Sequence, residues 1–332
     1  MLNLLNLKKD ELKNYLVENG FKGFRANQIN DWVYNKKIFD FNDMSNLSKV
    51  EREKFSQILN VSLPHIEKVQ ESKDGTIKFL LKLNDGNLIE CVFMMYNYGN
   101  TICMSTQVGC RMGCKFCAST VNGFIRNLEL SELMSQILIV EKYTSKKINR
   151  IVLMGTGEPL YNYDNVVTFI RDMKDKLGMS SRHITLSTCG IVPRIYDLAK
   201  EGLSINLAIS LHAVNDGKRK SLMPISNKYS IDELIEACIY YFDETKRRIS
   251  FEYLLIDGLN DGDDDSNVLK RAKAHVNIIP VNEIDENNFR ESTRVNKFTN
   301  DLIKNGINAT IRQKKGVDID AACGQLRLSY SK

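Results

Sequence analysis

The chain has 332 residues, of which 43% are hydrophobic and 26% are charged, and its net charge is +5. This composition is that of a globular protein able to bury a full core. The apolar runs are too short to span a bilayer, and the N-terminus becomes charged too soon to be a secretory signal. Eight unevenly spaced cysteines in so long a chain exclude a small secreted disulfide scaffold. We therefore expect a cytoplasmic protein, outside the membrane, with a metal site and scattered thiols.

The first sixty residues predict a small helical module, with helices over 10–20, 24–37 and 45–59 and the only tryptophan, Trp32. Two strands follow, at 76–83 and 88–95, and a turn at Asn84-Asp85-Gly86 separates them. We therefore expect a helical accessory domain over residues 1–62 and a β-rich connector over 63–100.

From Thr101 onward, short apolar strands alternate with amphipathic helices. The clearest helices cover 130–143 and 164–178, and we expect the second to begin after the N-cap Asp164 and to end at Gly178. The predicted strands lie at 101–105, 150–155, 183–188, 205–211, 249–256, 275–281 and 307–313. Such βα units predict a parallel sheet with right-handed crossovers. Six units are too few for an eightfold barrel, so residues 101–332 should form an α/β partial barrel, of the TIM-like (β/α)6 type, with its chemistry at the C-terminal ends of the strands.

Three cysteines, Cys110, Cys114 and Cys117, crowd into the stretch "STQVGCRMGCKFCAS", directly after the first barrel strand. Thiolates bind soft metals, so an iron–sulfur cluster and zinc are both candidates. A closed zinc site usually has four ligands in two close pairs, and no matching pair lies nearby. Three thiolates on a four-iron cluster would leave one iron open to the amino and carboxylate groups of a small molecule. Zinc, or three unrelated thiols, remains the alternative.

The segment "CRMGCKFC" resembles the cysteine signature of the radical S-adenosylmethionine superfamily, and "GTGEP" resembles its glycine-rich motif ending in glutamate. More narrowly, seven segments in order are similar to the RlmN/Cfr family of RNA adenine methyltransferases, and closer to its RlmN members. They are "QVGCRMGCKFCAST", "GFIRNL", "MGTGEP", "HITLSTCGIVP", "LAISLHA", "LMPI" and "DIDAACGQLR". The resemblance covers essentially the whole chain.

The resemblance implies a [4Fe-4S] cluster on Cys110, Cys114 and Cys117, and two molecules of S-adenosylmethionine consumed per turnover. It also implies the residues that bind S-adenosylmethionine: Gly157, Glu158, Ser187, Ser210, Leu211, His212 and Asn282. The implied reaction is methylation at C2 of adenosine 2503 in 23S rRNA and, in some tRNAs, of adenosine 37. The alternative is Cfr-type methylation at C8 of the same rRNA adenosine, which confers antibiotic resistance.

The chemistry explains why a lone late cysteine is needed. The C2 carbon of adenine is neither acidic nor nucleophilic, so the one-carbon unit must arrive as a radical. The resemblance makes Cys323 the methyl carrier, Cys103 the thiol that resolves a transient protein–RNA adduct, and Glu90 the base that takes the ring proton. From the residues alone, Cys103 would instead be a small core residue, and Glu90 an acid paired to an Arg or Lys.

The implied partners are 23S rRNA and tRNA, and an electron donor such as flavodoxin or ferredoxin with its reductase; we expect a monomer. The N-terminal module and the basic runs "GKRK", "KRR" and "RQKK" are the natural RNA-binding surfaces, although each run is equally a solvated face. The chain departs from the family at two positions. Cys189 stands where serine is usual, and "PVNE" replaces a segment that usually contains tryptophan.

Overall fold

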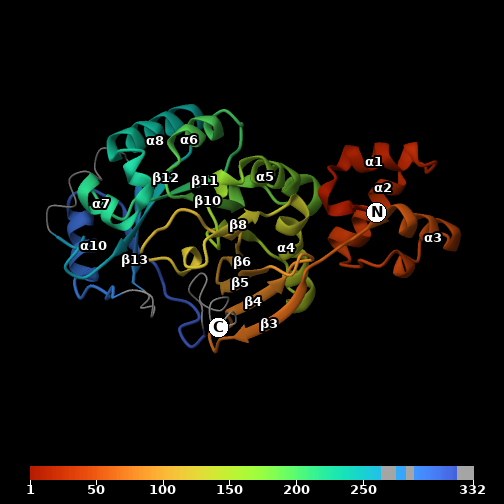
Figure 1. Cartoon of the computed structure of the whole chain (residues 1–332), viewed down its shortest axis with the longest axis horizontal. Helices are drawn as coiled ribbons and strands as arrows, with labels where there is room; N and C mark the ends of the chain where they lie inside the picture. Colours follow the sequence, from red (N-terminus) through yellow and green to blue (C-terminus); the bar gives the residue numbers. More distant parts are fainter. Residues whose placement is uncertain (263–273, 282–287, 320–332) are drawn as a thin grey trace.

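The computed structural model describes residues 1–262, 274–281 and 288–319. A helical N-terminal module stands beside a larger α/β body (Figure 1). The core of the N-terminal module contains the completely buried side chains of Leu16, Ile29, Val33 and Phe55. The module confirms the expected helical N-terminus. Its elements are α1 Lys9–Glu18, α2 Arg25–Asn30, the π-helical turn η2 Asp31–Asn35, the 3-10 turn η3 Phe41–Asp43 and α3 Lys49–Ile58.

The two ends of the module are tied together and to the body. Strand β1 Leu2–Asn3 pairs in parallel with β2 Leu59–Asn60. The 3-10 turn η1 Leu4–Asn6 packs at the start of α4 Leu130–Thr144, where the Ser131 amide donates to Asn6 Oδ1 at 2.7 Å. At the other end of α4, Lys37 forms a 2.6 Å ion pair with Glu141. These contacts hold the module along the length of one body helix.

The body is built on one sheet of ten strands in the described residues, in the order β14-β13-β12-β11-β10-β9-β6-β5-β4-β3. Strands β6 and β9 to β14 are parallel neighbours, and β3 to β6 are antiparallel. The predicted connector strands therefore continue the sheet of the barrel. The bounds are β3 His65–Glu71, β4 Ile77–Lys82, β5 Leu88–Tyr96, β6 Gly99–Met104, β9 Arg150–Leu153, β10 Ile184–Thr188, β11 Asn206–Ser210, β12 Ile249–Leu255, β13 His275–Pro280 and β14 Ala309–Ile311.

Helices in the connections between strands cover the outer face of the parallel part of the sheet (Figure 1). They are α4, α5 Tyr163–Leu177, α6 Val192–Ala199, α7 Asp216–Leu222, α8 Ile231–Thr245 and α10 Val295–Lys304. Strands β14 and β3 end the sheet without pairing to each other in the part described, so the prediction of an open partial barrel is confirmed. The end of α5 at Gly178, with φ 65°, is confirmed. Its predicted N-cap is wrong, because Asn162 is the cap and Asp164 lies within the first turn.

Over the described residues, the helices are all too short or too polar to cross a bilayer. A small hairpin stands at the C-terminal end of β6 and is made of β7 Gln107–Gly109 and β8 Phe124–Asn127. The three clustered cysteines lie in the loop between these two strands. The fold thus brings them to the edge where parallel-sheet proteins gather their chemistry.

Candidate active site

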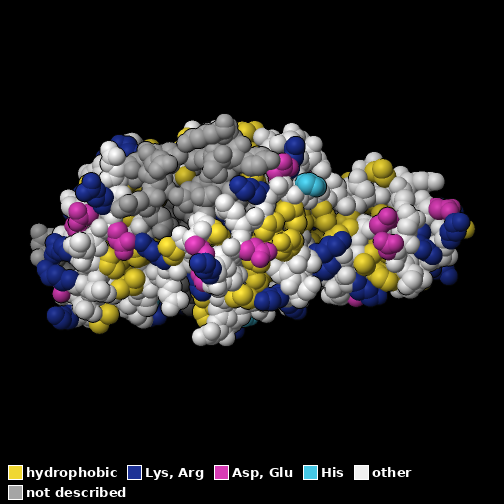
Figure 2. Space-filling view, turned by 90° about the horizontal axis from the view of Figure 1, so that it is seen from below, with side chains coloured by type: hydrophobic (Ala, Val, Ile, Leu, Met, Phe, Trp, Pro, Cys, Tyr) yellow, Lys and Arg dark blue, Asp and Glu magenta, His cyan; other side chains and the backbone are white. Residues whose placement is uncertain are grey.

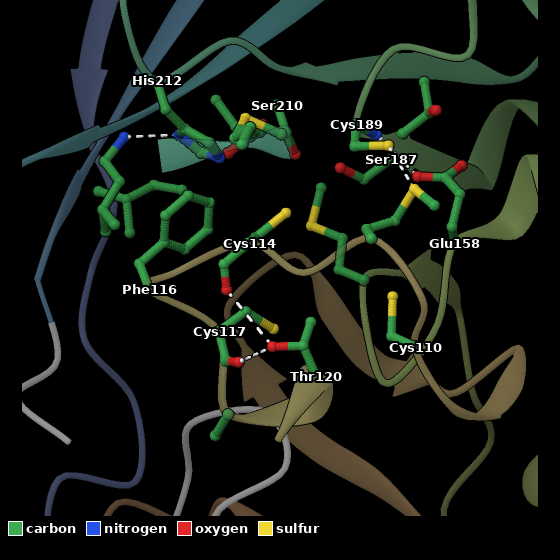
Figure 3. A pocket seen from close by; sticks show the side chains of 18 of the residues that line it. Cys110, Cys114, Phe116, Cys117, Thr120, Glu158, Ser187, Cys189, Ser210 and His212 are labelled. Atoms are coloured by element: carbon green, nitrogen blue, oxygen red, sulfur yellow. Dashed lines mark hydrogen bonds between the residues drawn. The ribbon is translucent and has the colours of Figure 1, made fainter. Parts of the chain in front are cut away.

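The cysteine loop is held from both of its sides. The Cys110 amide donates to Gly123 O at 3.0 Å, and the Lys115 amide donates to Leu222 O, also at 3.0 Å. The Thr120 hydroxyl donates to Cys117 O at 2.9 Å. Cys110, Cys114 and Cys117 all line one cavity of about 270 Å³ at the C-terminal ends of the strands (Figure 3). The structure therefore brings together the three predicted metal ligands.

The chemistry of these thiols fits an iron–sulfur cluster. Burial raises the pKa of Cys110 to about 12 and that of Cys114 well above its usual range. Thiolates here therefore need a cation to hold them deprotonated, which a metal supplies. In the part of the chain described, no three Cys, His, Asp or Glu side chains converge on a single metal ion. Three thiols that line one cavity without meeting at a single point suit a cluster, in which each thiolate binds a different iron, better than they suit tetrahedral zinc.

The "GTGEP" segment requires its glycines because the backbone passes against β7. Gly157 has φ 114°, and a Cβ there would lie 2.7 Å from Gln107 Cβ. The next amide, that of Glu158, donates to Gln107 Oε1 at 2.8 Å. This close approach carries Glu158 into the cavity from the end of β9.

Glu158 is buried, and its carboxylate accepts two backbone hydrogen bonds. The amide of Cys189 donates at 2.8 Å (Figure 3), and that of Leu160 donates at 3.0 Å. Burial raises the pKa of Glu158, and these hydrogen bonds oppose the rise. A carboxylate held in this way at the cavity wall can receive an ammonium group, which is the role that the resemblance implied.

The other predicted cofactor contacts come from the ends of β10 and β11. Ser187, Ser210 and His212 line the same cavity, while Leu211 is completely buried behind it. His212 stacks edge-on against Phe116 with ring centroids 4.7 Å apart. Its Nδ1 accepts a hydrogen bond from the Leu254 amide at 2.9 Å, so the ring is neutral with its proton on Nε2. Gly157, Glu158, Ser187, Ser210 and His212 are thus gathered around one space.

Glu90 and Cys103 lie on a neighbouring part of the sheet. Val92 pairs with Cys103 across β5 and β6, and because side chains alternate, Glu90 shares a face with Cys103. Lys78, on the adjacent strand β4, lies beside Glu90, and its Nζ is 3.2 Å from the Glu90 carboxylate. Lys78 and Glu90 are both almost completely buried. Glu90 is therefore an acid paired to a lysine, which was the alternative that the residues alone suggested. Neither Glu90 nor Cys103 lines the described wall of the cavity.

Tyr96 connects this face to the cavity. It lies on the same face of β5 as Glu90, and burial, together with the neighbouring Tyr98, raises its pKa. Cys103 raises the pKa of Tyr96 and Arg312 lowers it, so both groups lie within electrostatic reach of its phenol. Arg312 lines the cavity. The predicted contacts Asn282 and Cys323 lie outside the described residues.

Sequence reasoning missed two charged groups at this site. Glu252 lines the cavity almost completely buried, and burial raises its pKa. It interrupts the apolar run "FEYLLI", the same signal that drew attention to Glu90. Arg219 is completely buried behind the strand ends, although the run "GKRK" suggested a surface. Cys189, the departure from the family, lines the cavity, with its Sγ 3.2 Å from Met112 Sδ.

Comparisons with known proteins agree with this geometry. A sequence model described as the radical SAM superfamily matches residues 104–267, and one described as the ribosomal RNA large subunit methyltransferase N-terminal domain matches residues 2–61. The chain is 52% identical to a protein of Clostridium perfringens (strain SM101), covering 100% of this chain and 98% of the relative. It is 51% identical to one of Clostridium novyi (strain NT), covering 99% of each. Both relatives are named probable dual-specificity RNA methyltransferase RlmN.

A crystal structure of a radical SAM methyltransferase from Sphaerobacter thermophilus superposes with a TM-score of 0.93 at 39% identity, covering 98% of this chain and 99% of that one. Radical SAM proteins carry a [4Fe-4S] cluster and S-adenosylmethionine, and the three thiols and the buried carboxylate around one cavity fit both groups. Full-length likeness, fold and site geometry therefore agree: the chain belongs to the RlmN family of radical SAM RNA methyltransferases.

Proposed function

We propose that the chain methylates C2 of adenosine 2503 in 23S rRNA and of adenosine 37 in some tRNAs. The observation that carries this is a three-thiol cavity in a chain whose N-terminal module matches that of ribosomal RNA large subunit methyltransferases. The names of the relatives, which state dual specificity toward RNA, support the two classes of substrate. A flavodoxin or ferredoxin with its reductase would supply electrons, and the enzyme would act as a cytoplasmic monomer.

On this proposal, each cofactor is held by a defined set of residues. Cys110, Cys114 and Cys117 hold the [4Fe-4S] cluster, and Glu158 with the ends of β10 and β11 holds S-adenosylmethionine. Asn282 would complete that set. When bound, this pair supplies the electron and the 5′-deoxyadenosyl radical that polar chemistry cannot. Two molecules of S-adenosylmethionine are consumed, one as the methyl donor and one as the radical source.

The side chains of the protein carry the carbon. The Cys323 thiolate accepts a methyl group from sulfur, a polar step that sulfur nucleophiles perform well. Transfer of one hydrogen atom from that methyl group to the 5′-deoxyadenosyl radical that the cofactors would supply leaves a carbon radical, which adds to C2. Glu90 takes the C2 proton from the adduct, and the cluster that Cys110, Cys114 and Cys117 would hold would accept the one electron released with it. The Cys103 thiolate attacks the Cys323 sulfur, the sulfur–carbon bond breaks, and its electron pair leaves with the carbon, which takes a proton to become the methyl group.

The arrangement of β5 and β6 supports the last two roles. Glu90 and Cys103 share one face of adjacent strands, so a base and a thiol are presented together. The ion pair with Lys78, whose Nζ lies 3.2 Å from the carboxylate, holds the Glu90 side chain in place on this face.

A second set of groups is suited to the RNA backbone. On the face shown in Figure 2, Lys and Arg side chains occur on the body, on the N-terminal module and along their junction. A cavity of about 560 Å³ at this junction is lined by Lys36, Lys37, Lys142, Lys146 and Lys147. Of these five, Lys37 pairs with Glu141 and Lys36 pairs with Asp31. We assign phosphate contacts to the remaining lysines, so charge reversal at Lys146 and Lys147 should weaken RNA binding and flatten its dependence on salt.

The regiochemistry can be tested directly. The protein is produced anaerobically in a bacterium without its own RlmN, the rRNA and tRNA are digested, and methyladenosine isomers are separated by mass spectrometry against standards. We expect 2-methyladenosine, and none from Cys323→Ala. Finding 8-methyladenosine alone would establish the Cfr-type reaction instead, and an active Cys323→Ala variant would refute the carrier role.

The resolving thiol has its own test. Cys103→Ala should leave RNA covalently attached to the protein, visible as a slow band on a denaturing gel. Cys91→Ala is the matched control, because Cys91 is also buried in the same sheet but faces the opposite side of β5 from Glu90. An adduct absent from Cys103→Ala, or present in both variants, would contradict the assignment.

A further inference from the structure

Arg219 is the largest of the completely buried side chains in the described residues. It belongs to the seven-residue helix α7, and the next residue on that helix, Lys220, is exposed. One cation of the basic run "GKRK" is therefore buried, while its neighbour faces solvent. The guanidinium lies behind the cavity, between the ends of β10 and β11.

In the described part of the chain, the hydrogen bonds of this guanidinium all go to neutral oxygens. Nη2 donates to Cys189 O at 2.7 Å and to Ser210 O at 3.1 Å, and Nε donates to Leu211 O at 3.1 Å. Nη1 donates to the Ser226 hydroxyl at 2.9 Å. Two of these carbonyls belong to the strand-end segment that carries His212, and the third to the residue whose amide bonds Glu158. Arg219 therefore joins the segments that form the wall of the cavity.

The charge of Arg219 is not matched by an ion pair. Within residues 1–262, 274–281 and 288–319, no carboxylate forms a salt bridge with it. A buried cation without a counter-charge is costly. Its Nη2 bonds the carbonyl of Cys189, and Cys189 lines the same cavity as Cys114. Cys114 is one of the three clustered cysteines, and three thiolates would give the loaded site a net negative charge.

We propose that Arg219 is the positioning residue of the cofactor site and also its fixed counter-charge. Its hydrogen bonds hold the carbonyls of Cys189, Ser210 and Leu211, which sets the shape of the S-adenosylmethionine pocket. Its charge stabilises the reduced, more negative state of the cluster and so raises the reduction potential. The inference rests on the proposed cluster at Cys110, Cys114 and Cys117.

The two roles can be separated by substitution. Arg219→Lys keeps the charge but loses the planar fork that reaches three carbonyls at once. Arg219→Gln loses the charge and keeps part of the hydrogen bonding. Lys220→Gln is the matched control, because it removes the same charge from the same helix at an exposed position, where solvent screens it.

The experiment uses holoenzyme reconstituted anaerobically, with iron and labile sulfide measured first. The midpoint potential of the cluster is followed by electron paramagnetic resonance in a redox titration, and the Kd for S-adenosylmethionine is measured by equilibrium binding. We expect a more negative potential in Arg219→Gln than in both wild type and Lys220→Gln. Arg219→Lys should keep the wild-type potential but bind S-adenosylmethionine about tenfold more weakly, the lower end of the range for residues that orient a metal site.

Each outcome has a distinct meaning. A wild-type protein without iron and sulfide would overturn the proposed cluster itself. With a loaded wild type, equal potentials in Arg219→Gln and Lys220→Gln would refute the counter-charge role. If Arg219→Gln does not fold, Arg219→Lys still tests both roles. An unchanged Kd for S-adenosylmethionine in Arg219→Lys would refute the positioning role. A shifted midpoint potential in this variant, which keeps the charge, would refute the counter-charge role.

Discussion

His212 holds a buried imidazole whose surroundings oppose protonation. Its Nδ1 already accepts the Leu254 amide, so a second ring proton would place two N–H groups against each other. Burial, assisted by the nearby charge of Arg219, lowers the pKa of His212 from 6.5 to about 3. The ring therefore stays neutral in the folded protein at neutral and mildly acidic pH.

The free-energy consequence can be calculated. In the unfolded chain the histidine titrates near pH 6.5, so below that pH the unfolded state binds a proton that the native state refuses. Because the pKa of His212 is lowered in the folded state, its full contribution to the free energy of unfolding is present above pH 6.5. That contribution is lost progressively as the pH falls toward 3. At pH 5 the contribution of this one group is RT ln(1 + 10^1.5), a loss of about 2 kcal/mol relative to pH 8.

The assay is urea unfolding of the metal-free, reduced protein at pH 8 and pH 5, for wild type and for His212→Asn. Asparagine keeps an acceptor for the Leu254 amide, tolerates the φ of 56° at this position and cannot titrate. Far-UV circular dichroism is the suitable probe, because the only tryptophan, Trp32, reports on the N-terminal module. Wild type should lose about 2 kcal/mol more than the variant between the two pH values.

His65→Gln is the control, because that side chain is 79% exposed and should leave the pH dependence unchanged. The same loss in wild type and in His212→Asn, to within about 0.5 kcal/mol, would refute the claim that His212 is buried as the neutral ring.

Three further outcomes follow from the site and the sheet. Cys114→Ala should lose iron, labile sulfide and the visible absorption after anaerobic reconstitution while keeping its circular dichroism, whereas Cys238→Ala, buried on α8, should keep all of them. Gly157→Ala should lower the free energy of unfolding by about 1–3 kcal/mol and weaken S-adenosylmethionine binding, because its Cβ would press on Gln107 in a backbone conformation that suits glycine. Lys78→Met should cost about 3–5 kcal/mol by leaving the Glu90 carboxylate buried without this cation, and adding Glu90→Leu should recover most of that loss in denaturant titrations.

Local sequence pattern was sufficient for the elements that bury one face. The seven barrel strands and helix α5 lie where alternation and periodicity placed them, because each of these segments must cover the same core. The start of α5 was wrong because several residues could cap it. Asn162 and Asp164 are both good caps, and the choice depends on the turn Pro159–Tyr161, which brings the chain in from the cavity.

Burial of charge was the part that sequence could not provide. In "GKRK" three adjacent cations look alike, and only the packing of α7 against the strand ends turns Arg219 inward. Lys78 and Glu90 each interrupt an apolar run, but their pairing depends on the register of β4 with β5, where Leu80 lies opposite Glu90. The register of two strands depends on residues far apart in the sequence. The sequence therefore indicated that Glu90 is unusual but did not identify Lys78 as its partner.

The same register decides how the connector relates to the chemistry. Because side chains alternate along a strand, a shift of one residue between β5 and β6 would put Glu90 and Cys103 on opposite faces. The observed pairing of Val92 with Cys103 places them on one face, together with Tyr96, whose phenol lies within electrostatic reach of Arg312 at the cavity wall. The antiparallel strands therefore do more than link the module to the barrel. On the proposed mechanism, the barrel strands hold the radical source, while the added strands present the base and, at their seam with the barrel, the thiol that releases the product.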